Sequence, residues 1–486
     1  MADIFKSGFI GMGSRVFIGK QADYKTTATA VRQYACPIQP GSRPAKQIES
    51  LQVDQLFPTF LRKKPLPSAV RVEGTYSMYF PIEKVISGAV DDAELPGGGT
   101  LGTFLDLWIK SMLGDKDPEM HGVVNANLTV DSGNMLNSTN TGTSIAEDQW
   151  LFAKYSMDTG IPAMTFVHKV FEASSTELNS QRYAVITGAK CSSATFNFSA
   201  DSPVTADFNF LALDEKITEA PTGNLTGNPA LDAPSQWDNI QGITSFGMNN
   251  GIFGPTYANS DLRSSVRSIE TAASEKTTDL FPNWSTQLFL KPASTDTKKS
   301  HGTSINIGAP TTLTSGEHRD CRIPFMDFSF TVNNNLDYPT ANNGSQYPSE
   351  PILTATKEVT GSLTLPFTDE IIDILTGGAA GARKDDQFKD FLNLKNFELS
   401  IVLQDPSKET DPGSEKVVIS FPEICFTGTA LGDIPQGEIT IPLSFAAYQP
   451  ANISTDGTPS TLGTTQSEAC IFYVGRQFKH DNDNES

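Results

Sequence analysis

The sequence contains one hairpin pattern twice, and this repetition restricts the possible folds more than any other feature of the chain. Residues 190–213 read KCSSATFNFSADSPVTADFNFLAL, with apolar and small polar residues alternating on both sides of a Ser-Ala-Asp-Ser-Pro turn. Residues 424–447 read ICFTGTALGDIPQGEITIPLSFAA and repeat this pattern 234 residues later. Alternation with a period of two is typical of a half-buried β-strand, so both stretches predict β-hairpins.

Further pairs of segments occur in the same order along the chain. They are GMGSRVFIG (11–19) with GMNNGIFG (247–254), the strand patterns around Val53 and Val332, Val72 and Gly74 with Val359 and Gly361, Met164 with Phe397, and Arg182 with Lys416. The offsets are 233–236 at both ends of this series and 279–287 in the middle, which predicts a duplication whose copies carry different insertions. Two unrelated all-β domains with similar alternation are the alternative.

A helix pattern follows the middle strand of each copy. In LGTFLDLWIKSMLG (101–114) the large apolar residues share one helix face. In TDEIIDILTGG (368–378) Thr368 suits the N-cap position and Gly377 suits the end of the helix. Because helices do not alternate with strands, a parallel α/β architecture is disfavoured, and an antiparallel β-fold with one helix per copy is predicted.

The repeats also predict the domain organisation. We expect a first domain at 1–214, a linker at 215–239, a second domain at 240–450 with an insertion near 255–320, and a C-terminal tail at 451–486. The first copy carries its own extra chain near 115–160. The linker contains prolines and glycines and no periodicity, and the tail contains one more strand pattern, IFYVGRQ (471–477).

Charge and cysteine content exclude several classes of protein. The chain has 36 basic and 56 acidic residues, a net charge of −20, so it lacks the basic surface of a nucleic-acid-binding protein. Five cysteines without C-x-x-C spacing argue against a disulfide framework or a zinc site, and we expect Cys191 and Cys425, on apolar strand patterns, to be buried thiols. No signal peptide pattern and no 18-residue apolar run occur, so no membrane span is expected.

Motifs that would indicate catalysis are weak or missing. The sequence has no P-loop, no H-E-x-x-H and no G-x-S-x-G, and its five histidines are far apart. A G-x-G-x-x-G motif at 97–102 follows Asp91, Asp92 and Glu94, whose charges would repel a pyrophosphate, and no parallel βαβ pattern surrounds it. A turn that enters the helix is favoured over a nucleotide loop. We therefore expect no enzyme activity, no catalytic residues, no cofactor and no metal.

With these elements in this order, the chain resembles the tail tube proteins of long-tailed bacteriophages. The features that carry the resemblance are the strand pattern near Val53, the extended loop after it, the strand GTYSMYF (74–80), the helix TFLDLWIKSML (103–113) and the closing hairpin GEITIPLSFAAY (437–448). The resemblance implies a mainly β fold with two tandem antiparallel β-sandwich domains, each with a flanking α-helix. These domains would contribute to an inner β-barrel when rings assemble.

The same resemblance implies a function. It indicates a structural virion protein that polymerises into stacked rings, which form the hollow tail tube for DNA passage. Subunits with one domain form rings of six, so a duplicated chain implies homotrimeric rings. The implied partners are further copies of the chain and the tail terminator, tail tip and tape measure proteins, with DNA passing transiently, no membrane, and assembly in the host cytoplasm. Another structural β-protein of the virion, a decoration protein or tail-associated adhesin, is the alternative.

Two surfaces are expected to matter in such a tube. The loop FPTFLRKKPLPSAV (57–70) holds the one basic cluster of the chain, Arg62, Lys63 and Lys64. This cluster either lies in a solvated loop or belongs to a long loop at 54–70 which, with its counterpart at 333–356, contacts acidic surface on the adjacent ring. The lumen is expected to be net negative, because an acidic wall repels phosphate and leaves DNA free to slide.

Overall fold

The computed structural model describes about half of the chain. The described residues are 9–28, 30–33, 38–39, 42–51, 66–80, 106–116, 119–123, 129–131, 150–172, 182–199, 202–219, 245–248, 286–292, 304–306, 322–339, 345, 347–368, 396–404, 415–429, 439–448 and 469–477. The fold is mainly β with antiparallel sheets, as the sequence predicts. No helix among these residues is long and apolar enough to cross a membrane.

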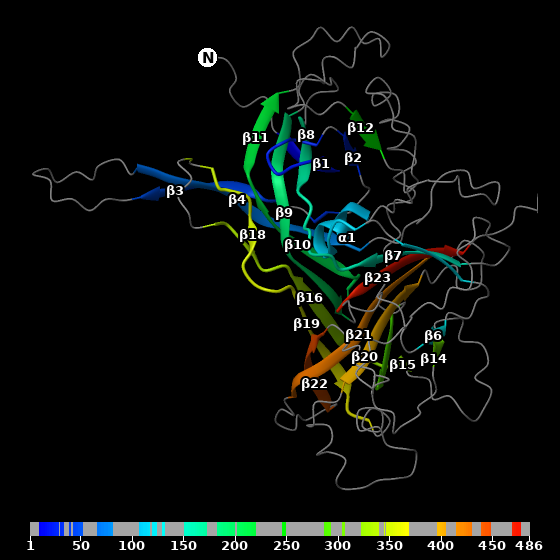
Figure 1. The fold of residues 1–486 in the computed structure, drawn as a ribbon. Coiled ribbons are helices and arrows are strands. Elements are labelled where there is room, and N and C mark those ends of the chain that lie inside the picture. Colours follow the sequence, from blue (N-terminus) through cyan, green and yellow to red (C-terminus); the bar gives the residue numbers. More distant parts are fainter. Residues whose placement is uncertain are drawn as a thin grey trace, which may run out of the picture.

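The first copy consists of two sheets that share one long strand (Figure 1). The first sheet contains β2 (Ala30–Gln33), β1 (Phe9–Lys20), β8 (Met164–Glu172), the first half of β9 (Arg182–Ser199) and β11 (Asp214–Glu219), and β12 (Ser245–Met248) adds to β2 in parallel. The second sheet contains the second half of β9, β10 (Thr205–Ala212), β4 (Leu66–Tyr79) and β3 (Ala45–Leu51). Because β11 occupies 214–219, the first five residues of the expected linker are strand.

The second copy repeats this arrangement. The first sheet contains β15 (Arg322–Ile323), β13 (Thr286–Pro292), β20 (Asn396–Gln404), the first half of β21 (Glu415–Thr429), β23 (Ile471–Gln477), β7 (Trp150–Ser156) and β5 (Glu119–Val123). The second sheet contains the second half of β21, β22 (Thr440–Ala447), β19 (Glu358–Pro366) and β16 (Asp327–Asn333). The strand predicted at 471–477 is thus confirmed, and it pairs with a strand from the first copy's extra chain.

Three smaller elements complete the described structure. The helix α1 (Asp106–Leu113) lies within the first predicted helix pattern, and its Trp108 and Met112 are buried. Two short two-stranded sheets pair β6 (Thr129–Asp131) with β14 (Ser304–Asn306) and β17 (Leu336–Asp337) with β18 (Ile352–Leu353). The second predicted helix, apart from its proposed N-cap Thr368, lies outside the described residues.

The two copies have matching strand registers. In β4 and β10, Gly74 lies opposite Phe210, and in β19 and β22, Gly361 lies opposite Phe445. A bulge in β9 leaves Ser192 without a pairing partner on β10. The same irregularity occurs 235 residues later in β21, where Thr427 has no pairing partner on β22. Bulges are local features that rarely coincide by chance, so the two strand sets are counterparts.

The registers correct two of the segment matches. β13, rather than GMNNGIFG (247–254), occupies in the second copy the place of β1, because Ile18 faces Phe166 as Leu290 faces Leu399. Likewise, the counterpart of Val332 is Lys46 rather than a residue near Val53. Val332 faces Val359, and Lys46 faces Val72, the counterpart of Val359. In the sequence, a short apolar pattern matches several alternating strands equally well. Only one alignment of the two copies agrees with the observed strand pairing.

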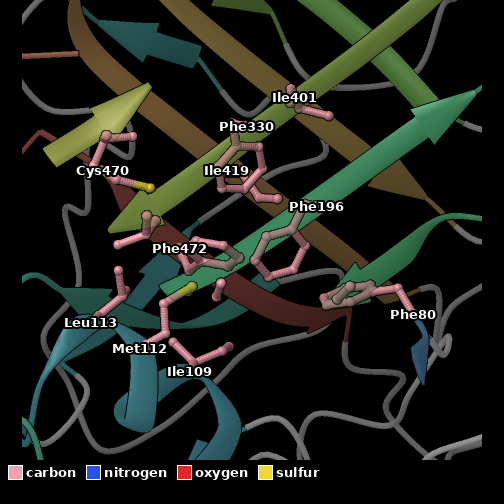
Figure 2. Packing of buried hydrophobic residues seen from close by; sticks show 14 of the residues in the cluster. Phe80, Ile109, Met112, Leu113, Phe196, Phe330, Ile401, Ile419, Cys470 and Phe472 are labelled. Carbon is pink, nitrogen blue, oxygen red and sulfur yellow. The ribbon is translucent and has the colours of Figure 1, made fainter. Parts of the chain in front are cut away.

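The buried side chains form one cluster that runs through both copies. Figure 2 shows Ile109, Met112 and Leu113 of α1 beside Phe472 of β23, and Phe196 of β9 beside Phe330 of β16. The rings of Phe196 and Phe330 stack with centroids 4.8 Å apart and 6° between their planes. The junction between the copies is therefore as well packed as a domain interior, and a division into two separate sandwiches stays a prediction.

One buried pair in this core makes stability depend on pH. The ring of His168 stacks on that of Tyr76, and Nε2 lies 2.6 Å from the Tyr76 hydroxyl. Burial, with a smaller contribution from the Arg43 charge, lowers the pKa of His168 to about 3. His168 is therefore a structural histidine in strand β8.

We expect the free energy of unfolding to fall as pH falls from 6.5 towards 3. In this window the unfolded chain binds a proton at residue 168 that the folded chain excludes, which costs up to about 1.4 kcal/mol per pH unit. His168→Gln keeps a hydrogen-bonding partner for Tyr76 and removes the titration. Denaturant unfolding of parent and variant between pH 6.5 and 4.5 should show a difference that shrinks by this slope, and parallel pH profiles would contradict the assignment.

Candidate functional site: the polar face of the central sheet

A continuous antiparallel sheet joins the second sheets of the two copies. Its strand order is β3, β4, β10, β9, β16, β19, β22, β21, which makes eight strands, four from each copy. The copies meet where β16 pairs with β9, from Asp327 opposite Ser199 to Asn333 opposite Ser193. The two sets of four are in the same order, so the second copy continues the first along the sheet.

The two faces of this sheet differ in chemistry. One face is the aromatic core described above, and burial alternates strictly along β10, β16 and β22. The opposite face carries hydroxyl and amide side chains. They are Thr75 and Ser77 on β4, Thr205 and Asn209 on β10, Ser193, Thr195, Asn197 and Ser199 on β9, Ser329, Thr331 and Asn333 on β16, Thr360, Ser362 and Thr364 on β19, and Thr440 and Ser444 on β22.

Many of these polar groups bond to one another across the strands. Asn209 accepts a hydrogen bond from the Thr75 hydroxyl and donates to Ser193 Oγ at 2.9 Å. At the junction of the copies the hydroxyls of Thr195 and Thr331 are 2.9 Å apart. These contacts satisfy donors and acceptors within the protein. Fewer of them are left to bind a molecule that passes over the surface.

Further along the sheet, the hydroxyls of Ser329 and Ser362 are 2.8 Å apart. Together with the preceding pairs they form a row of short side chains that crosses five strands, from β4 to β19. Short hydroxyl side chains also leave the surface flat compared with one built from lysine or arginine.

Few charges interrupt the polar face. At its described positions stand four carboxylates, Glu73, Asp207, Asp327 and Glu358, and one guanidinium, Arg71. Lys190, at the end of the face, is paired with Glu350 at 2.5 Å. The face is therefore mildly acidic, with carboxylates spread over four strands rather than gathered in a ligand cluster. Among the described residues no group of acidic, histidine or cysteine side chains could hold a metal ion.

The connection from β16 to β19 binds the second copy to the first. The buried Asn334 amide donates to the carbonyls of Met112 (3.0 Å) and Cys191 (2.9 Å). The Tyr338 hydroxyl lies 2.8 Å from the carbonyl oxygen of Ala212. These bonds end on the first copy's helix and strands, so this connection is part of the junction.

Lys357, at the end of the same connection, caps helix α1. Its Nζ donates to the carbonyl of Leu113 at 3.0 Å and to that of Asp158. Burial lowers the pKa of Lys357 to about 8, against the opposing effects of Asp158 and Cys191. A cation at a helix C-terminus is favourable, and here it comes from the other copy.

The outer edges of the sheet have no strand partner among the described residues. Segment 42–47, which includes the start of β3, pairs with β4 on one side only. At the far end of the sheet, Gly428 and Thr429 of β21 pair only with β22. These two edges are the counterparts of β16 and of the second half of β9, which pair with each other inside the chain.

The structure places the sequence-derived candidates as follows. Arg62, Lys63 and Lys64 lie outside the described residues, as does the glycine motif at 97–102. Residues 66–70 of the expected loop belong to β4, and the described part of 333–356 packs on the first copy of its own chain. Cys191 is buried as expected, while Cys425 is half-buried.

Sequence reasoning missed the polar face. Its signal was present as Ser, Thr and Asn at every second position of strands whose other positions are aromatic. A single strand does not show that its polar face continues across both copies, because that depends on the pairing of β9 with β16.

The family model described as phage tail tube protein matches residues 11–256 and 270–447. The second stretch begins after GMNNGIFG and before β13, in agreement with the strand registers. No curated protein matches the chain.

Proposed function

This chain belongs to the phage tail tube proteins, a structural family of the virion tail, and we propose that three copies close into a ring and that rings stack into a hollow tube for DNA. The observation that carries the proposal is the junction between β9 and β16. It shows how one copy of the strand set adds to the next. The two edges left over, residues 428–429 and residues 42–47, are the counterparts of the two strands that meet in this junction, so the edge of a second chain can add in the same way.

Repetition of one junction produces either a closed ring or an open helix. Closure satisfies every sheet edge and stops sideways growth. Three chains of eight strands give a barrel of 24 strands. At a strand spacing of about 4.8 Å and a tilt of about 40°, its backbone diameter is about 48 Å, which admits a DNA duplex. A barrel of eight strands, by contrast, would be filled by side chains.

In this arrangement the polar face lines the lumen, because the opposite face is the buried core. The four carboxylates against one guanidinium support the expectation of a net negative wall. The hydrogen bonds between hydroxyls add a second property, since groups already bonded to each other compete poorly for phosphate oxygens. DNA then meets a surface that repels it weakly and offers few donors.

A cryo-EM map of the assembled tube tests this proposal. We expect three chains per ring, the two copies alternating around a pseudo-sixfold barrel, and threefold features outside because the insertions differ. Six full-length chains per ring, or one copy outside the inner barrel, would refute the arrangement.

The proposal extends to the contacts between rings. β3 and the start of β4 project away from the body of the molecule (Figure 1), and the segment between them carries Arg62, Lys63 and Lys64. We infer that these cations meet acidic surface on the adjacent ring. In the same map they should lie within ion-pair distance of that ring, and a loop confined to its own ring would refute this.

The remaining partners follow from the place of a tube in a tail. A tube needs proteins that start, measure and end it, so we include tail tip, tape measure and tail terminator proteins, with assembly in the host cytoplasm. The domain limits at 214, 239 and 450 stay part of the proposal. The first limit is adjusted, because β11 belongs to the first copy and the connection between the copies therefore begins after Glu219.

A further inference from the structure

A group of four charged residues covers the outer edge of the sheet in the first copy. The Lys46 backbone N–H donates to Glu215 Oε2 at 2.9 Å, and the Arg43 guanidinium lies 2.9 Å from Glu215 Oε1. The Lys46 ammonium in turn lies 2.8 Å from Asp214 Oδ1. Asp214 and Glu215 are largely buried at the start of β11. We call Arg43, Lys46, Asp214 and Glu215 the edge clasp.

The edge clasp occupies a backbone donor that the second copy uses for strand pairing. Lys46 is the counterpart of Val332, which lies opposite Ala194 in the junction of the copies. The N–H of Asn334, two residues further and on the same edge, donates to the carbonyl of Ser192. In the first copy the equivalent donor, the backbone N–H of Lys46, points away from β4 and donates to the carboxylate of Glu215.

Among the residues that the structure describes, the clasp is present only in the copy whose edge has no strand partner. In the second copy β23 takes the place of β11, because Ile471 faces Ser420 as Lys216 faces Val185, so the positions of Asp214 and Glu215 correspond to Ala469 and Cys470. Neither residue can carry a carboxylate. The second copy, whose edge is paired with β9, thus lacks the carboxylates that cover the edge in the first copy.

The neighbouring outward donors are also unavailable. The Ser42 N–H points back to the carbonyl of Gln39, at 3.4 Å, and Pro44 has no N–H. Charged side chains and proline are common means of protecting an exposed strand edge from pairing. Along 42–46 the Lys46 N–H is therefore the one outward donor that a change of partner can release.

We propose that the edge clasp is a lock on lateral assembly, which keeps this edge closed in the unassembled chain and opens when a second copy of the chain docks. On docking, the Lys46 N–H leaves Glu215 and donates to the carbonyl of Thr429 in the incoming chain, the counterpart of Ala194. Arg43 keeps the Glu215 charge paired. The proposal rests on the proposed ring but concerns its control.

Amide hydrogen exchange tests the closed state. In the unassembled parent chain the Lys46 amide should exchange slowly. In Glu215→Ala it should exchange about 10-fold faster or more, while the amides of Ala45 and Gln47, which face β4, keep their rates. Equal exchange of the Lys46 amide in both proteins would overturn the lock.

Assembly kinetics test whether the edge clasp limits lateral assembly. Glu350→Ala is the matched control, because it removes a carboxylate paired with a lysine at the same end of the sheet but touches no backbone N–H at this edge. We expect Glu215→Ala to form rings and tubes with a lag at least about 10-fold shorter than parent or control. If the parent, Glu215→Ala and Glu350→Ala all assemble on preformed tube seeds with the same lag, the proposed lock is wrong, whereas the proposed ring is not contradicted. If none assembles even with seeds, although Lys46 exchange responds, the proposed ring itself fails.

Discussion

Thr360→Lys is expected to lower the plaque titre of a phage carrying it by about 100-fold or more, while tubes still form. Thr360 is exposed at the third position of β19, on the polar face. A lysine there adds three cations to every ring of the proposed tube. Each phosphate contact releases counterions and adds to the affinity for DNA, and contacts repeated along stacked rings accumulate. A wall that DNA should slide past would then hold it.

Thr360→Gln is the matched control, because it adds a side chain of similar length without charge. Its titre should stay close to that of the parent phage. Triggered release of DNA from purified particles should be slow for the lysine variant and recover as salt is added, since counterion release weakens with ionic strength. Lysine and glutamine variants with equal titres and equal release rates would show that this face is not the path of the DNA.

The fold could be predicted from the sequence wherever one strand alone carries the signal. The hairpins around Phe208 and Phe445 alternate so regularly that strand, turn and buried face all follow from period two. The helix around Trp108 follows equally from its apolar spacing. The duplication was visible because two hairpins kept their offset of 234–235 residues.

The rest depended on contacts between segments that are distant in sequence. β13 takes the place expected for residues 247–254, and the pairing partner of Val72 is Lys46, because strand pairing rather than local composition selects among similar apolar patterns. The edge clasp could not be predicted either. Glu215 belonged to a segment without periodicity, and its role arises only once β11 lies beside the edge at Lys46.

Gly361→Val is expected to destabilise the chain by about 3 kcal/mol, near the upper limit for overpacking of a core. A Cβ at this position would lie 2.4 Å from Cζ of Phe445 and 2.5 Å from the backbone oxygen of Ser329. The Phe445 ring cannot turn away freely, because it stacks on Phe328 with 14° between the planes. Relief therefore requires β19 to separate from β16 or β22, both of which belong to the eight-stranded sheet.

Ser362→Val is the control, since it places the same β-branched side chain one residue later, on the exposed polar face. It loses the hydrogen bond to Ser329 and should cost no more than about 1 kcal/mol. Denaturant unfolding of the unassembled proteins measures both changes. The glycine also has a counterpart, Gly74 opposite Phe210, where a Cβ would lie 2.8 Å from the Cα of Pro44. Both copies thus place a glycine opposite a phenylalanine at a point where a Cβ has no room, although the neighbour it would meet is the Phe445 ring at Gly361 and the Pro44 backbone at Gly74. If Gly361→Val unfolds at the same denaturant concentration as Ser362→Val, the ring does not fill that space, and this packing cannot be what fixes the register of the sheet.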